Sequence, residues 1–166
     1  MDNLFTLDIY VLAVFYFFMF HSKWLTPSGR KDWKTPKELY KELNKRFRFD
    51  FDPCPANPKF DGLSIEWMCS NYVNPPYGRE LSKWLKKCYD ECLKGKTVVV
   101  LIPSRTDTIW WHKYVMKASE IWFVKGRLKF DDKENGAPFP SAIIIFEGGS
   151  KGFPLIKSVN ILAESI

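Results

Sequence analysis

The sequence predicts an α/β fold with a sheet of about five strands, mostly parallel, and an antiparallel strand near the C-terminus. The continuous apolar run at 97–103 (TVVVLIP) is typical of a strand that is covered on both faces. Helical patterns at 80–95 and 104–118 lie on either side of this run, which favours parallel strands joined by helices. The apolar runs at 120–130 and 141–147 follow each other without a helix, so they can pair as antiparallel neighbours.

The first helix is expected within 32–47. Thr35 suits the N-cap, Pro36 suits the first helical position, and Glu38 completes a capping box. Apolar residues then recur every four positions on one face, which consists of Leu39, Leu43 and Phe47.

Two short strands and a second helix follow. The alternating run at 48–54 predicts a strand that ends at Pro53, and the run at 69–73 predicts a short buried strand. The helix at 80–95 has Gly95 as its expected C-cap. Its apolar face consists of Leu81, Trp84, Leu85, Cys88 and Cys92.

The C-terminal third continues with a loop and helix at 104–118 and a strand at 120–130 that is interrupted at Gly126. The run at 141–147 is expected to be the last strand, because the tail from Gly148 is weakly patterned. The sequence therefore divides into a hydrophobic extension at 1–22, a domain at 23–150 and a tail at 151–166.

Composition limits the function classes. The 166 residues carry a net charge of +6, which permits a polyanionic partner such as nucleic acid without requiring one. The four cysteines form no C-x-x-C pair and the chain has two histidines, so we predict free thiols, no metal site and a reducing, cytoplasmic location. The uncharged run at 9–20 is too short to span a bilayer and lacks the features of a signal peptide. A packed helix, a membrane-surface segment and an extension upstream of the true start are the open interpretations; we expect an appendage without a part in the chemistry and no membrane partner.

The block Asn74-Pro75-Pro76-Tyr77 stands where a buried strand ends, and ligands of α/β sheets bind at the carboxyl ends of strands. The simplest structural interpretation is a rigid turn, because two prolines fix two φ angles. The flanking residues suit a more specific purpose. The amide oxygen of Asn74 and the carbonyl of Pro75 can accept both N–H bonds of a planar amine, and Tyr77 offers a flat face to its ring.

Six runs of the sequence together resemble the phage-type DNA N-6-adenine methyltransferase family, a class I S-adenosylmethionine-dependent family. They fall in the family's order and cover about residues 30–147. The NPPY block alone is shared with methyltransferases that act on glutamine or RNA amines, so all six runs carry the resemblance. They are Asp32-Trp33-x-Thr35-Pro36, Phe51-Asp52-Pro53-Cys54-x-Ala56-x-Pro58, Asn74-Pro75-Pro76-Tyr77-Gly78, Leu101-x-Pro103-x-Arg105-Thr106-Asp107, Gly126-Arg127-Leu128-x-Phe130 and Ala137-Pro138-Phe139-Pro140-Ser141-Ala142.

The resemblance implies a shortened Rossmann-like methyltransferase sheet and methylation of an adenine flipped from double-stranded DNA. S-adenosylmethionine is the implied cofactor, without a metal, in a phage-encoded protein that acts in a prokaryotic cytoplasm, with a homodimer as one expected assembly. The catalytic residues by resemblance are Asn74, Pro75, Pro76 and Tyr77. Orientation and hydrogen bonding would supply the catalysis, because the amine becomes acidic only after methyl transfer.

The resemblance also assigns the binding residues. The cofactor residues are Asp32, Trp33, Thr35, Pro36, Asp52, Pro53, Cys54 and Asn74, with Asp52 accepting the ammonium group. Arg105, Arg127 and Phe139 are the expected DNA contacts, whereas a solvated strand residue and a packing aromatic are the plain interpretations of Arg127 and Phe139.

The chain departs from the usual pattern near the cofactor. It has no Gly-rich G-x-G after the first strand, and only nineteen residues separate Cys54 from Asn74. The acidic residue that normally holds the ribose therefore has only Asp61 and Glu66 as candidates. Two other functions stay open from the sequence: methylation of an RNA base or a glutamine amide, and a decayed methyltransferase that only binds nucleic acid.

Overall fold

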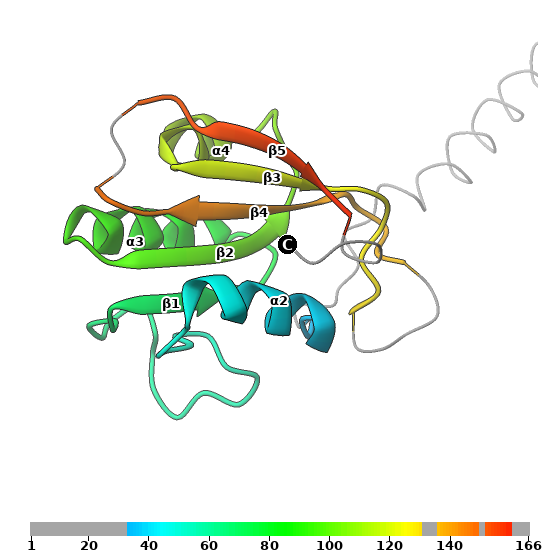
Figure 1. Ribbon diagram of the computed structural model, residues 1–166. Helices are drawn as coiled ribbons and strands as arrows, with labels where there is room; N and C mark the ends of the chain where they lie inside the picture. The colour runs from blue at the N-terminus through cyan, green and yellow to red at the C-terminus, as the bar shows by residue number, and fades with distance from the viewer. Residues whose placement is uncertain (1–32, 131–135, 150–151, 161–166) are drawn as a thin grey trace, which may run out of the picture. The chain divides into compact units, whose positions relative to one another are not determined.

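The computed structural model describes residues 33–130, 136–149 and 152–160 (Figure 1). The predicted extension at 1–22 and Asp32 lie outside these residues. In the described part of the chain, no helix has the length and apolar character needed to cross a membrane.

A five-stranded sheet in the order β1-β2-β4-β3-β5 forms the frame of the structure (Figure 1). Its strands are β1 (Ser70–Val73), β2 (Thr97–Pro103), β3 (Glu120–Val124), β4 (Ser141–Phe146) and β5 (Leu155–Val159). β1 pairs with β2 and β3 pairs with β5 in parallel, whereas β4 is antiparallel to both of its neighbours. The predicted α/β sheet with one antiparallel strand near the C-terminus is thus confirmed, including the antiparallel pairing of β3 with β4.

Three strand predictions need correction. The run at 120–130 forms a strand only over β3, which ends at Val124, and Gly126 turns the chain beyond it with a φ of +80°. The run at 48–54 makes only an isolated parallel bridge, between Phe51 and Asn71, instead of a strand. The chain turns there because the Asp52 carboxylate accepts the Cys54 N–H at 2.8 Å and Pro53 has no N–H to donate. In the weakly patterned tail, β5 forms a fifth strand at the sheet edge. Leu155 and Ile156 are both more than half exposed, so this strand lacks the alternation that marks a buried one.

Helices cover both faces of the sheet, with α2 (Lys37–Phe47) on one side and α3 (Leu81–Leu93) and α4 (Ile109–Lys113) on the other (Figure 1). A single 3₁₀ turn, η2 (Val115–Lys117), follows α4. The prediction that Thr35 caps α2 is wrong. Pro36 occupies the N-cap and its carbonyl accepts the Tyr40 N–H at 3.1 Å, while the Thr35 hydroxyl bonds elsewhere.

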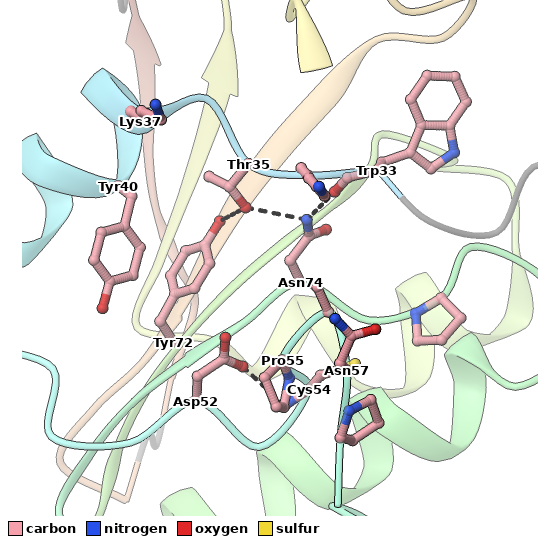
Figure 2. A pocket seen from close by; sticks show the side chains of 14 residues that line it. Trp33, Thr35, Lys37, Tyr40, Asp52, Cys54, Pro55, Asn57, Tyr72 and Asn74 are labelled. Atoms are coloured by element: carbon pink, nitrogen blue, oxygen red, sulfur yellow. Dashed lines mark hydrogen bonds between the residues drawn. The ribbon is translucent and has the colours of Figure 1, made fainter. Parts of the chain in front are cut away.

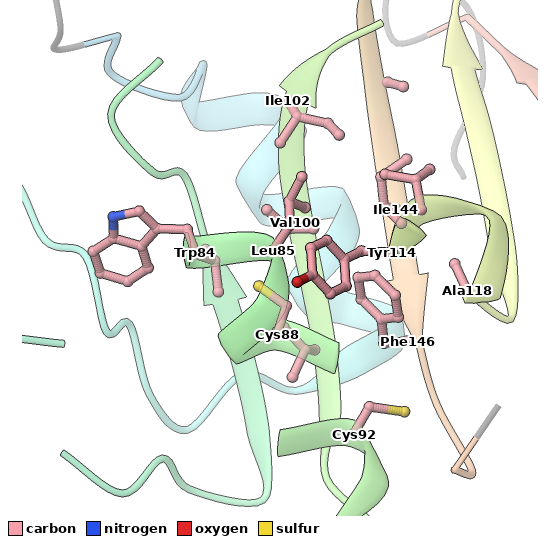
Figure 3. Close-up of a cluster of buried hydrophobic side chains, with 14 of the residues drawn as sticks. Trp84, Leu85, Cys88, Cys92, Val100, Ile102, Tyr114, Ala118, Ile144 and Phe146 are labelled. Atoms are coloured by element: carbon pink, nitrogen blue, oxygen red, sulfur yellow. The ribbon is translucent and has the colours of Figure 1, made fainter. Parts of the chain in front are cut away.

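Alternate residues of β2 enter two separate hydrophobic clusters, as expected for a strand covered on both faces. Val98, Val100 and Ile102 pack with α3 and α4, whereas Val99 and Leu101 pack with α2. Figure 3 shows the first cluster, in which Cys88 and Cys92 of α3 are buried. The whole predicted apolar face of α3 is buried, and Gly95 follows this helix with a φ of +88°.

Glu91 is a buried charge on α3 that ties this helix to the loop before β2. Lys87 and Lys94 reach its carboxylate at 2.9 and 2.8 Å, and Lys96 reaches it at 2.7 Å. Burial disfavours the carboxylate, but the hydrogen bonds from Lys94, Lys96 and Lys87 outweigh burial and lower the pKa of Glu91 to about 2.

Candidate active site

A pocket of about 640 Å³ opens at the carboxyl end of β1 (Figure 2). Three segments build it: the chain that leads into α2, the turn after the Phe51 bridge, and the first residues after β1. Its lining consists of Trp33, Lys34, Thr35, Lys37, Tyr40, Asp52, Cys54, Pro55, Ala56, Asn57, Pro58, Tyr72, Asn74 and Pro76. The site therefore lies where open α/β sheets bind their ligands.

Asn74 stands at the centre of a hydrogen-bond network in the pocket wall (Figure 2). Its Nδ2 donates to the carbonyl of Trp33 and to Thr35 Oγ1, the latter at 3.0 Å. Its Oδ1 accepts from the Tyr77 hydroxyl at 2.9 Å. Because both N–H bonds are occupied by acceptors, the carboxamide is held in one orientation, and one lone pair of Oδ1 remains beyond the bond from Tyr77.

Tyr77 turns its hydroxyl inward, toward Asn74 and toward the carbonyl of Leu101 at 3.3 Å. Burial raises the pKa of this hydroxyl well above its ordinary value, so it stays a donor. Its ring packs edge-on against Phe139 and Phe130, with centroid distances of 5.5 and 6.3 Å. Trp33 contacts the same two phenylalanines at 5.2 and 5.3 Å. Four aromatic residues thus gather beside the Asn74 side chain.

Asp52 places a carboxylate on the opposite wall of the pocket. One oxygen accepts the Cys54 N–H at 2.8 Å, which leaves acceptor positions on the carboxylate directed at the pocket (Figure 2). Burial raises the pKa of this carboxyl, although the bond from Cys54 partly opposes the rise. Among the described residues Asp52 forms no ion pair, although Lys34 and Lys37 also line the pocket, so this half-buried carboxylate favours a positively charged ligand.

The turn that contains Asp52 packs closely against the backbone of Gly62. A Cβ at this position would lie 1.9 Å from the carbonyl oxygen of Pro53, so only glycine permits the approach. The carbonyl of Gly62 accepts the indole N–H of the buried Trp67 at 2.7 Å. The position of the pocket wall therefore depends on a glycine outside the pocket.

The structure brings together most of the residues assigned by resemblance. Trp33, Thr35, Asp52, Cys54 and Asn74 line the pocket, as does Pro76. Pro36, Pro53 and Pro75 do not line the pocket themselves, but each is next in the sequence to a residue that does. Phe139 contacts Trp33 and Tyr77. Arg105 and Arg127 are exposed and belong to loops that follow β2 and β3.

Sequence reasoning missed Lys37, Tyr40, Asn57 and Tyr72. Tyr72 belongs to the strand predicted at 69–73, and its position two residues before Asn74 is the sequence signal that it could reach the site. Neither candidate for the ribose acid belongs to the lining. Asp61 instead accepts the N–H of Leu63 at 3.0 Å, and Glu66 pairs with Lys96 at 3.3 Å.

The fold and the site together define an α/β methyltransferase-type domain. The sequence profile of the DNA N-6-adenine-methyltransferase (Dam) family matches residues 23–148, which is most of the chain. The chain belongs to this family of adenine-specific DNA methyltransferases. It is also similar to a DNA N-6-adenine-methyltransferase of Haemophilus phage HP1 (strain HP1c1), with 28% identity over 144 residues that cover 74% of this chain and 82% of the phage protein. Membership implies a methyl donor and a DNA substrate.

Proposed function

We propose that this protein transfers a methyl group from S-adenosylmethionine to the N-6 amine of an adenine that is flipped out of double-stranded DNA. The observation that carries the proposal is the fixed carboxamide of Asn74. Its two N–H bonds are held by Trp33 and Thr35, so its oxygen is the atom left to meet an amine. An oxygen acceptor is what an exocyclic amine requires, because that amine donates two hydrogen bonds.

The pocket beside Asn74 fits the proposed cofactor. S-adenosylmethionine supplies, when bound, an electrophilic methyl group on a positively charged sulfonium. Asp52 is the residue for the ammonium group of its methionine part, because the carboxylate is half-buried and faces the pocket. Trp33, Thr35 and Cys54 form the surrounding wall, with Pro36 and Pro53 fixing the backbone on either side.

The chain acts on the amine through hydrogen bonds rather than through a strong base. The oxygen of Asn74 and the carbonyl of Pro75 accept the two N–H bonds and turn the amine lone pair outward. Pro76 keeps the Pro75 carbonyl rigid because it restricts the backbone of the residue before it. Tyr77 and Phe139 hold the flipped ring among the aromatic side chains that already surround them.

The charged loops supply the proposed DNA contacts. Arg105 and Arg127 are exposed at the ends of two strands that run in the same direction, so both can reach phosphates around one site mouth. We expect them to position the duplex without specifying its sequence. A homodimer and action in a prokaryotic cytoplasm, within a phage-encoded setting, belong to the same proposal.

One experiment tests the proposed reaction. Plasmid DNA is incubated with the purified full-length protein and S-adenosylmethionine, digested, and read by mass spectrometry for N-6-methyladenine. The wild type should produce the modified base, whereas Asn74→Ala should lose it and keep the circular dichroism spectrum of the wild type. Asn44→Ala serves as the matched control, since Asn44 accepts the Phe49 N–H at the end of α2 and is not one of the residues that line the pocket.

The outcomes separate the competing functions. Binding of S-adenosylmethionine without methylated DNA would redirect the search to RNA bases and glutamine amides. Absence of cofactor binding in calorimetry would favour a protein that only binds nucleic acid.

A further inference from the structure

A chain of hydroxyl groups supports the catalytic amide from behind. Tyr72 Oη lies 2.7 Å from Thr35 Oγ1, and Thr35 Oγ1 accepts from Asn74 Nδ2 at 3.0 Å (Figure 2). The three residues come from two distant parts of the sequence, because Thr35 precedes α2 whereas Tyr72 and Asn74 belong to β1 and the residue after it. The fold therefore connects Tyr72, Thr35 and Asn74 through two consecutive hydrogen bonds.

From this arrangement we infer that Tyr72 and Thr35 are positioning residues that act through Asn74. This inference rests on the proposed function and adds to it the residues that orient its acceptor. A hydroxyl can donate or accept, so Thr35 alone would leave the orientation of the Asn74 carboxamide open. The bond to Tyr72 Oη, in which either hydroxyl can donate, holds the Thr35 oxygen where it accepts from Asn74 Nδ2. The amide N–H then points to Thr35 and the amide oxygen points toward Tyr77.

The orientation matters because the two ends of a carboxamide have nearly the same shape and opposite chemistry. A reversed Asn74 would present N–H donors to an amine that is itself a donor. The carbonyl of Trp33 favours the same orientation through its own bond from Asn74 Nδ2. Two acceptors, on Trp33 and Thr35, thus select the orientation that the proposed reaction requires, and the bond to Tyr72 keeps the second acceptor in place.

Tyr72 is held rigidly enough for this task. It is 2% exposed, and its ring packs edge-on against Tyr40 at 5.1 Å and beside Phe49 at 5.3 Å. Its register in β1, opposite Val99 of β2, places the ring in the α2-side cluster. These ring contacts do not involve the hydroxyl, so Tyr72→Phe removes one hydrogen bond and retains the packing.

The test separates orientation from binding and from stability. Single-turnover methylation of DNA and calorimetric binding of S-adenosylmethionine are measured for Tyr72→Phe, Thr35→Val and Thr35→Ser. We expect the first two to lower the single-turnover rate about tenfold at saturating S-adenosylmethionine, where a change in cofactor affinity no longer limits the rate. Thr35→Ser keeps the hydroxyl and should recover most of the rate. Because Tyr72 acts through Thr35, the double variant Tyr72→Phe/Thr35→Val should be no slower than Thr35→Val alone.

A spectroscopic readout is independent of turnover. In ¹⁵N-labelled full-length protein, the side-chain amide peaks of Asn74 are assigned as those that vanish in Asn74→Asp. They should exchange slowly with solvent in the wild type and faster in Tyr72→Phe and Thr35→Val. Tyr114→Phe is the matched control, because Tyr114 is another buried tyrosine that packs in the cluster on the other face of the sheet (Figure 3).

Two results would overturn the inference. One is a wild-type single-turnover rate in Tyr72→Phe; the other is unchanged exchange of the Asn74 amide in both hydroxyl-deleted variants. Failure of the proposed function looks different, since the wild type itself would then leave DNA unmethylated while the amide exchange still responded to Tyr72→Phe.

Discussion

Replacement of Asp52 by Asn tests the proposed cofactor contact most directly. The amide of Asn keeps an oxygen for the Cys54 N–H, so the turn should persist, while the charge that faces the pocket is lost. A hydrogen bond between charged groups contributes about 1.5–3 kcal/mol, which corresponds to roughly 10- to 100-fold in affinity. We therefore expect Asp52→Asn to weaken binding of S-adenosylmethionine by that factor.

Isothermal calorimetry at neutral pH measures this loss, and Asp61→Asn is the matched control because Asp61 is exposed and absent from the pocket lining. A cofactor analogue without the amino group sharpens the test, since Asp52→Asn should weaken its binding little further. Burial raises the pKa of Asp52, so wild-type affinity should fall on acidification sooner than an ordinary aspartate predicts, whereas Asp52→Asn should lack this fall. An affinity within twofold of wild type in Asp52→Asn at neutral pH would refute the proposed contact.

Three further changes probe the frame and the DNA surface. Gly62→Ala should lower the free energy of unfolding, measured by urea denaturation, by about 1–3 kcal/mol. Gly78→Ala is the control and should keep the wild-type stability, because an added Cβ there meets nothing within 4 Å. Equal stabilities of the two variants would contradict the close approach at Gly62. The pKa of the Glu91 carboxyl is about 2 in the folded protein, below its ordinary value of 4.5. The ionised carboxylate therefore adds roughly 3 kcal/mol to the free energy of unfolding above pH 4.5, and this contribution is lost as the pH falls toward 2. Glu91→Gln should therefore be less stable than wild type at pH 7 and should lose less stability on acidification, as measured by urea denaturation at several pH values. Arg127→Ala should weaken DNA binding for all sequences alike and reduce the slope of log affinity against log salt by about one, as measured by fluorescence anisotropy; an unchanged slope would remove Arg127 from the phosphate contacts.

Local patterns in the sequence were sufficient for most of the secondary structure. The apolar face of α3, the continuous run of β2 and the pairing of β3 with β4 all follow from periodicity and from the spacing of turn residues. The block Asn74-Pro75-Pro76-Tyr77 could also be recognised, because its four residues are consecutive in the sequence. A strand at the sheet edge such as β5 escaped detection, since its side chains are mostly exposed and it joins the sheet through its pairing with β3.

Contacts between distant residues were decided by the tertiary structure alone. Thr35 looked like a helix cap, because capping is a local rule, yet its hydroxyl lies between Tyr72 and Asn74, which are 37 and 39 residues away. The approach of Gly62 to Pro53 and the gathering of aromatic residues around Tyr77 are likewise invisible in any short window. The sequence by itself thus determined most of the elements and their order, and it singled out the block Asn74-Pro75-Pro76-Tyr77. The packing of α2 against β1 decided which hydroxyl groups hold that block, because hydrogen bonds depend on distances in space that sequence separation does not encode.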